Sequence, residues 1–86
     1  MRYGYARTNN GQDIKTQIRA LNDANVDMIF SDENKGTRQE RAGYNKLMSL
    51  ISKGDTIVVT EPHRLTRDSI AFAKLSKNGI HLTALN

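Results

Sequence analysis

The sequence contains no cysteine, which excludes disulfides, thiolate catalysis and cysteine-based zinc sites. No apolar run approaches the length of a membrane-spanning helix. The first residues, MRYGYAR, also lack the apolar segment of a secretory signal peptide. We therefore expect a cytoplasmic protein with no membrane segment.

The chain of 86 residues is long enough for one domain with a modest core. Thirteen Lys and Arg residues against nine Asp and Glu residues give a net charge of +4 and a pI near 9.7. This balance favours a polyanionic partner. The two histidines, His63 and His81, lie far apart in the sequence and have no clear third ligand. Neither a metal site nor a cofactor is therefore predicted.

Short apolar segments alternate with segments of helical period along the chain. Strands are expected at Tyr3–Ala6, Met28–Phe30, Ile57–Val59 and Ile80–Leu85. Helices are expected from Gln12 to Leu21, from Tyr44 to Ile51 with Gly54 as the stop signal, and around Ile70–Leu75 before Asn78-Gly79. The segment Thr8–Gly11 is interpreted as a polar turn and Ser31–Arg41 as a charged, mobile loop. This order predicts an α/β fold with a mainly parallel sheet of about four strands and flanking helices.

The segment Asp55–Asp68, DTIVVTEPHRLTRD, is the centre of this pattern. Its β-branched run predicts a strand buried on both faces of the sheet, which Pro62 ends. Arg64 and Arg67 follow, at the start of a helix expected near Thr66. Arginines three residues apart on a helix can converge on one anion beside the N–H groups of the helix start. The segment therefore suggests a phosphate site, although two solvated surface arginines would give the same pattern.

A third arginine, Arg7, ends the first predicted strand. Ligands of parallel sheets gather where the carboxyl ends of strands meet helix starts. If the first and third strands are neighbours, Arg7 lies at the same sheet edge as Arg64 and Arg67. Arg41, at the start of the second predicted helix, could join them together with the charged loop.

Five segments of the chain resemble the catalytic domain of serine recombinases of the resolvase/invertase type. They are YART (5–8), TQIRAL (16–21), KGTRQERAG (35–43), KGDTIVV (53–59) and HRLTRDS (63–69). They follow one another in the order found in the family and cover essentially the whole chain. The resemblance implies a three-layer resolvase-like fold, DNA as the partner, and chemistry in which a serine attacks a DNA phosphodiester.

The position of that serine is occupied by Asn9 in this chain. A carboxamide is not a nucleophile for phosphodiesters, because its nitrogen lone pair is delocalised and it has no acidic proton whose removal would make it one. Thr8 is the only nearby hydroxyl. Side chains alternate along a strand, so Thr8 should face away from Arg7 if the strand reaches it. The comparison predicts a domain that cannot form the phosphoserine intermediate.

Other family positions are kept. The resemblance assigns site roles to Gln17 in the first helix and to four arginines, Arg7, Arg41, Arg64 and Arg67, of which the last two match the pair that binds the scissile phosphate. Three neighbours differ from the family, namely Lys35 in place of a loop serine, His63 in place of an aspartate and Thr66 in place of a glycine. The gain of Lys35 and the loss of the aspartate make the site more positive, which favours holding an anion over turning it over.

The family continues into a long dimerisation helix and a DNA-reading helix-turn-helix domain, and neither fits into this sequence. A single resolvase-like domain is therefore expected, as a monomer or weak homodimer. Three interpretations of the function stay open at this point. The first is a degenerate recombinase domain that keeps its phosphate pocket, and the second is a catalytic fragment that needs absent parts. The third is a regulatory or interaction protein that reuses the fold.

Overall fold

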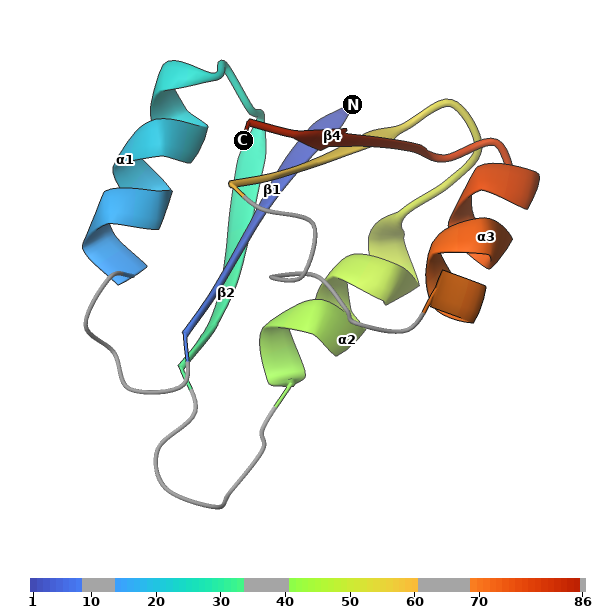
Figure 1. Cartoon of the computed structure of the whole chain (residues 1–86), viewed down its shortest axis with the longest axis horizontal. Coiled ribbons are helices and arrows are strands. Elements are labelled where there is room, and N and C mark those ends of the chain that lie inside the picture. The colour runs from blue at the N-terminus through green and yellow to red at the C-terminus, as the bar shows by residue number, and fades with distance from the viewer. Residues whose placement is uncertain (9–13, 34–40, 61–68, 86) are drawn as a thin grey trace.

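The structure is a computed structural model that describes residues 1–8, 14–33, 41–60 and 69–85. Its elements are β1 (Arg2–Thr8), α1 (Ile14–Asp23), β2 (Met28–Glu33), α2 (Ala42–Leu50), β3 (Thr56–Val59), α3 (Ser69–Lys77) and β4 (His81–Ala84) (Figure 1). The predicted alternation of strands and helices is confirmed. None of the helices in the described ranges has the length and apolar character needed to cross a bilayer.

The four strands form one sheet in the order β2-β1-β3-β4, with every neighbouring pair parallel. β1 is one of the two inner strands and pairs with β2 from Tyr3 beside Met28 to Thr8 beside Glu33. On its other side, β1 pairs with β3 from Arg2 beside Thr56 onward. The first and third strands are therefore neighbours, and their carboxyl ends lie at the same edge of the sheet.

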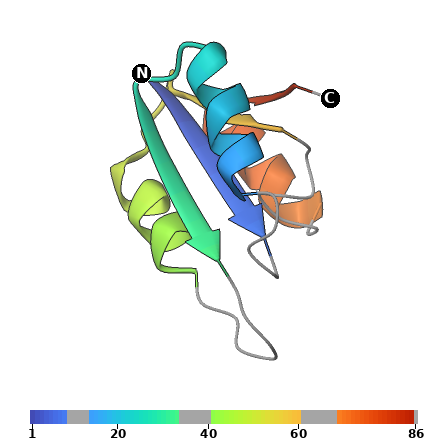
Figure 2. The ribbon, with the colours of Figure 1, turned by 90° about the vertical axis from the view of Figure 1, so that its left-hand side faces the viewer.

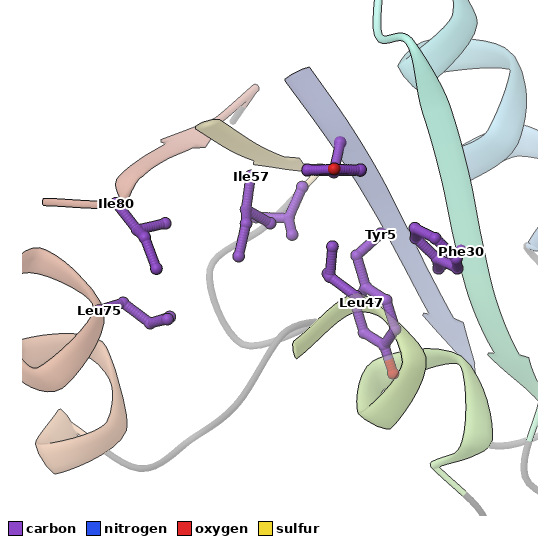
Figure 3. Close-up of a cluster of buried hydrophobic side chains, with 8 residues drawn as sticks. Tyr5, Phe30, Leu47, Ile57, Leu75 and Ile80 are labelled. Carbon is purple, nitrogen blue, oxygen red and sulfur yellow. The ribbon is translucent and has the colours of Figure 1, made fainter. Parts of the chain in front are cut away.

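The sheet is the middle of three layers, with α1 on one face and α2 and α3 on the other (Figures 1 and 2). The residues of β1 alternate between these two faces, because successive side chains of a strand point in opposite directions. The larger core lies on the α2 and α3 face and contains Tyr3, Tyr5, Phe30, Leu47, Ile57, Val59, Leu75 and Ile80 (Figure 3). The smaller core lies against α1 and contains Ala6, Ile14, Leu21 and Val58.

The first two strands extend further than the sequence predicted. Thr8 was expected in a turn and Ser31 to Glu33 in the charged loop. Instead, Thr8 lies in β1 and pairs with Glu33, and Ser31 and Asp32 lie in β2 and pair with Ala6 and Arg7. Both expectations were wrong because they relied on apolar side chains. Strand pairing instead satisfies the backbone N–H and C=O groups, so it can continue through polar residues.

The end of α2 also differs from the prediction. Ile51, expected in the helix, is already extended with φ −70° and ψ 143°, so the helix ends at Leu50 rather than at Gly54. Gly54 instead has φ +92° in the turn before β3, a conformation that glycine adopts without steric cost.

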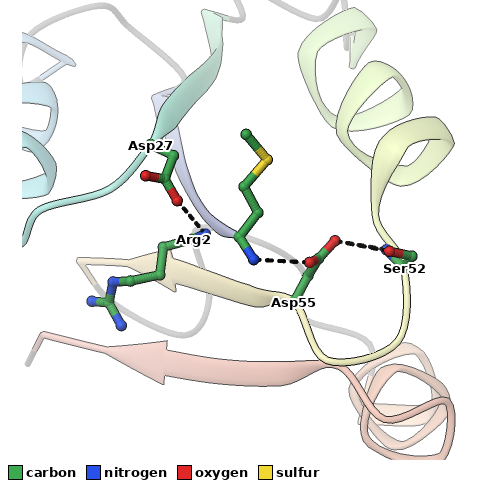
Figure 4. A network of polar contacts seen from close by, with 5 residues as sticks. Arg2, Asp27, Ser52 and Asp55 are labelled. Carbon is green, nitrogen blue, oxygen red and sulfur yellow. Dashed lines mark hydrogen bonds and ion pairs between the residues drawn. The ribbon is translucent and has the colours of Figure 1, made fainter.

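The amino-terminal edge of the sheet is held by two aspartates (Figure 4). The Asp55 carboxylate accepts a hydrogen bond from the amino group of Met1 at 3.0 Å and another from the Ser52 N–H at 2.9 Å. The Asp27 carboxylate accepts the N–H of Arg2 at 2.8 Å. These contacts fix the start of β1 against β2 and β3. They lie at the opposite edge of the sheet from the predicted site.

Candidate functional site

The predicted site residues divide into two groups. Arg7, Thr8, Gln17 and Arg41 belong to the part of the chain that the structure describes. Asn9, Lys35, His63, Arg64, Thr66 and Arg67 lie outside the described residues. The site can therefore be built from the end of β1, from α1 and from the start of α2.

Arg7 lies near the carboxyl end of β1, level with Asp32 of β2. By the alternation along the strand it shares a face with Tyr5, which belongs to the core under α2 and α3. Arg41 is the residue immediately before α2, the helix that covers this same face. The two described arginines of the predicted site are thus placed on one face of the sheet, toward one edge.

Gln17, on α1, holds the end of β1 through the backbone of Arg7. Its Oε1 accepts the Arg7 N–H at 3.0 Å, and its Nε2 donates to the Arg7 C=O at 2.9 Å. The Met1 C=O accepts the Thr56 N–H of β3, so odd-numbered residues of β1 direct their backbone groups toward β3. Because Gly4 pairs with Val58, Arg7 lies beyond the end of β3. The Gln17 carboxamide therefore takes the place of the neighbouring strand there and holds the backbone of Arg7.

Thr8 is only 2% exposed. It lies in β1 and, by alternation, on the α1 face with Ala6, opposite to Arg7. The sequence-based argument required the strand to reach this residue, and it does. Its hydroxyl is directed away from the face that carries Arg7 and Arg41.

Arg41 packs its guanidinium group on an aromatic ring. Its Cζ lies 3.8 Å from the centroid of the Tyr44 ring, the arrangement of a cation–π contact. The Tyr44 ring in turn contacts Tyr5 edge-on, with 6.0 Å between the ring centroids. The position of Arg41 is therefore linked through Tyr44 to β1, an inner strand of the sheet.

Asp32 is a site residue that the sequence analysis missed. It lies in β2, is only 6% exposed, and accepts three hydrogen bonds: from the Tyr5 hydroxyl at 2.5 Å, the Gly43 N–H at 2.8 Å and the Tyr44 N–H at 2.9 Å. The alternation of side chains along a strand could have identified it. Asp32 continues the strand face of Met28 and Phe30, where a carboxylate needs partners to be buried.

The electrostatics of this cluster keep Tyr5 protonated. Burial raises the pKa of the Tyr5 hydroxyl well above its usual range, and the hydrogen bond to Asp32 raises this pKa further. The nearby Arg41 guanidinium acts in the opposite direction but is outweighed. Tyr5 therefore stays protonated at neutral pH and remains a hydrogen-bond donor to Asp32 there.

The arrangement can attract an anion through side chains rather than through a helix start. A helix N-terminus binds anions through its free N–H groups. In α2, the N–H groups of Gly43 and Tyr44 already donate to Asp32. Guanidinium groups such as those of Arg7 and Arg41 can supply the attraction instead. Within the described ranges, no three His, Asp or Glu side chains gather as a group that could hold a metal ion.

Comparison with known proteins identifies the protein family of this chain. The family model described as "Resolvase, N terminal domain" matches residues 2–86. The chain is 34% identical over 90 aligned positions to a DNA-invertase from Escherichia phage P1, covering 99% of this chain and 48% of that protein. It is 38% identical over 78 positions to the Transposon Tn3 resolvase from Escherichia coli, covering 87% of this chain and 42% of that protein. The chain thus spans about half the length of these relatives or less.

Solved structures share the fold. A serine recombinase from Sulfolobus solfataricus superposes with a TM-score of 0.77 at 24% identity, covering 99% of this chain and 69% of that one. The first ORF of transposon ISC1904, from Sulfolobus solfataricus P2, gives a TM-score of 0.78 at 23% identity, covering 99% of this chain and 66% of that one. With the family match over residues 2–86, this chain belongs to the resolvase N-terminal domains of the serine recombinase family.

Proposed function

We propose that this domain binds the DNA backbone at a resolvase/invertase-type site but does not form a covalent link to DNA. The observation that carries the proposal is the placement of Arg7 and Arg41 on one sheet face, on elements joined by Asp32. The relatives named DNA-invertase and Transposon Tn3 resolvase support DNA as the partner.

The proposed phosphate site contains Arg7, Arg41, Arg64 and Arg67, with Lys35 beside it. The neighbouring, parallel arrangement of β1 and β3 supports this grouping. Arg64 and Arg67 occur in the sequence between β3 and α3, the helix that covers the same face as α2. The carboxyl ends of adjacent parallel strands are where such folds bind their ligands.

The proposed loss of cleavage rests on Asn9, which follows directly after β1 in the sequence. Its carboxamide cannot attack a phosphodiester. The burial of Thr8 on the opposite face supports the view that the neighbouring hydroxyl does not replace the missing serine. In this proposal, the domain is a recombinase fold that retains phosphate recognition without the phosphoserine step.

DNA affinity measured across salt concentrations tests the binding part of the proposal. Each lost phosphate contact should reduce the slope of log affinity against log salt by about one. We expect this change for Arg41→Ala. Arg19→Ala removes an exposed arginine from α1, on the opposite face, and should leave the slope nearly unchanged. Equal slopes for both variants would refute the phosphate site and favour an interaction protein that reuses the fold.

Covalent trapping on a nicked suicide substrate tests the absence of cleavage. We expect no protein–DNA adduct, because the domain offers no serine at the position of Asn9. Mass spectrometry that finds a phosphopeptide linkage on any residue, Thr8 included, would refute this part. Substituting Asn9→Ser in the same assay asks whether the remaining site still supports the attack.

A further inference from the structure

We propose that Asp32 and Tyr5 form a positioning pair that sets the pose of the Arg41 guanidinium, through the first turn of α2 and through the Tyr5 hydroxyl itself. The expected effect on DNA binding rests on the proposed function, in which Arg41 contacts a DNA phosphate. Neither residue was predicted as part of the site. Their contacts connect β1, β2 and α2 at the place where Arg41 begins the helix.

The first step concerns the start of α2, which is capped from another element. Helix starts leave N–H groups without partners, and the residue before the helix usually accepts from them with a side-chain oxygen. Arg41 occupies that position and makes no such side-chain bond. A guanidinium group has no acceptor. Asp32 supplies the acceptor from β2, at 2.8 Å from the Gly43 nitrogen and 2.9 Å from the Tyr44 nitrogen.

The second step concerns the orientation of the Asp32 carboxylate. Oδ1 accepts from Gly43, whereas Oδ2 accepts from both Tyr44 and the Tyr5 hydroxyl. Rotating the carboxylate would weaken all of these bonds together. The Tyr5 hydroxyl comes from β1, an inner strand, and therefore fixes the carboxylate relative to the sheet rather than relative to the helix alone.

The third step leads from the carboxylate to Arg41. Tyr44 uses its N–H in the cap and carries the ring on which the Arg41 guanidinium lies, 3.8 Å from the centroid. Holding the Tyr44 backbone therefore holds the surface that orients Arg41. The edge-on contact between the Tyr5 and Tyr44 rings fixes the other side of that surface. The Arg41 guanidinium also interacts directly with the Tyr5 hydroxyl. Arg41 is thus positioned by neighbours that need not touch the phosphate themselves.

The variant Tyr5→Phe tests the pair with the least disturbance, because it keeps the ring and removes only the hydroxyl. Asp32→Asn is the second variant, and Tyr3→Phe is the control. Tyr3 lies on the same face of β1, but it is level with Met28, two residues further along β2 from Asp32 than Phe30, with which Tyr5 pairs. NMR reports the pose directly, since the Tyr44 ring current shifts the side-chain protons of Arg41 upfield. We expect this shift to shrink in Tyr5→Phe and to persist in Tyr3→Phe.

DNA affinity gives the functional readout in a double-mutant cycle. Tyr5→Phe should weaken binding about fivefold in the unaltered chain, but by much less when Arg41 is already alanine. A merely structural role of Tyr5 would instead give equal losses in both backgrounds, and would overturn the proposal. An unchanged Arg41 shift in folded Tyr5→Phe would overturn it as well. If the shift shrinks but Arg41→Ala does not affect DNA binding, the positioning holds and the proposed phosphate role of Arg41 fails.

Discussion

Replacing Gly43 with alanine should destabilise the domain, against the usual preference of helices. An added Cβ would lie 2.5 Å from the carbonyl oxygen of Ser31, 3.0 Å from its carbonyl carbon and 3.1 Å from its nitrogen. All three are backbone atoms of β2, so no side-chain rotation can make room. The start of α2 would have to move away from the sheet.

The expected magnitude follows from opposing contributions. Alanine gains up to about 1 kcal/mol over glycine in a helix interior. Overpacking costs about 1–3 kcal/mol where the surroundings cannot relax. Moving α2 outward also lengthens the bonds from Gly43 and Tyr44 to Asp32, and hydrogen bonds to charged groups contribute about 1.5–3 kcal/mol each. We therefore expect the free energy of unfolding to fall by about 1–3 kcal/mol for Gly43→Ala.

Urea denaturation followed by circular dichroism measures this change. Asn45→Ala is the matched control, since Asn45 lies in the same helix and is exposed. It should alter stability by no more than about 0.5 kcal/mol, in the stabilising direction. An increase in stability for Gly43→Ala would show that α2 does not approach β2 this closely. It would also remove the basis for the Asp32 cap.

Three further predictions concern other polar contacts. Gln17→Leu should lower the free energy of unfolding by about 1–3 kcal/mol in urea titration, because it leaves the N–H and C=O groups of Arg7 without these partners. An unchanged free energy of unfolding would contradict the role of Gln17 in bonding to the end of β1 in place of a neighbouring strand. Burial raises the pKa of Tyr5, so stability is retained below the ordinary tyrosine pKa of about 10 and lost above it, where the unfolded chain ionises. Melting temperatures taken from about pH 9 to 11 should therefore fall less steeply for Tyr5→Phe. The hydrogen bond from Ser52 lowers the pKa of Asp55, so the stability advantage over Asp55→Asn should be present above about pH 4 and disappear as the pH falls through the lowered pKa; a difference that does not change with pH would contradict this.

The fold class could be predicted because it depends on local patterns. The run of Ile57, Val58 and Val59 is apolar and β-branched, and these residues are buried in β3 as expected. The helical period of Ile14, Ile18 and Leu21 places the buried side of α1 against the sheet. Spacing of apolar residues is a property of the sequence alone, since burial on one face is the main force that shapes each element.

The polar part of the site could be predicted only where single residues matched a family pattern. Such a match suggested roles for Arg7, Gln17 and Arg41, and it identified Asn9 at the nucleophile position. It gave no information on which groups each side chain contacts. Arg64 and Arg67 remain predictions, as does their convergence with Arg7.

The tertiary structure alone decided how the polar groups are paired. Asp32 appeared as one charge in a loop, and its role as the cap of α2 required the register of β2 on β1 and the close approach of Gly43 to Ser31. The two bonds of Gln17 likewise depend on β3 ending before it reaches Arg7. A hydrogen bond forms only within a few tenths of an ångström of its ideal distance. Such precision arises from the packing of elements that are distant in sequence, and no local pattern of residue types contains it.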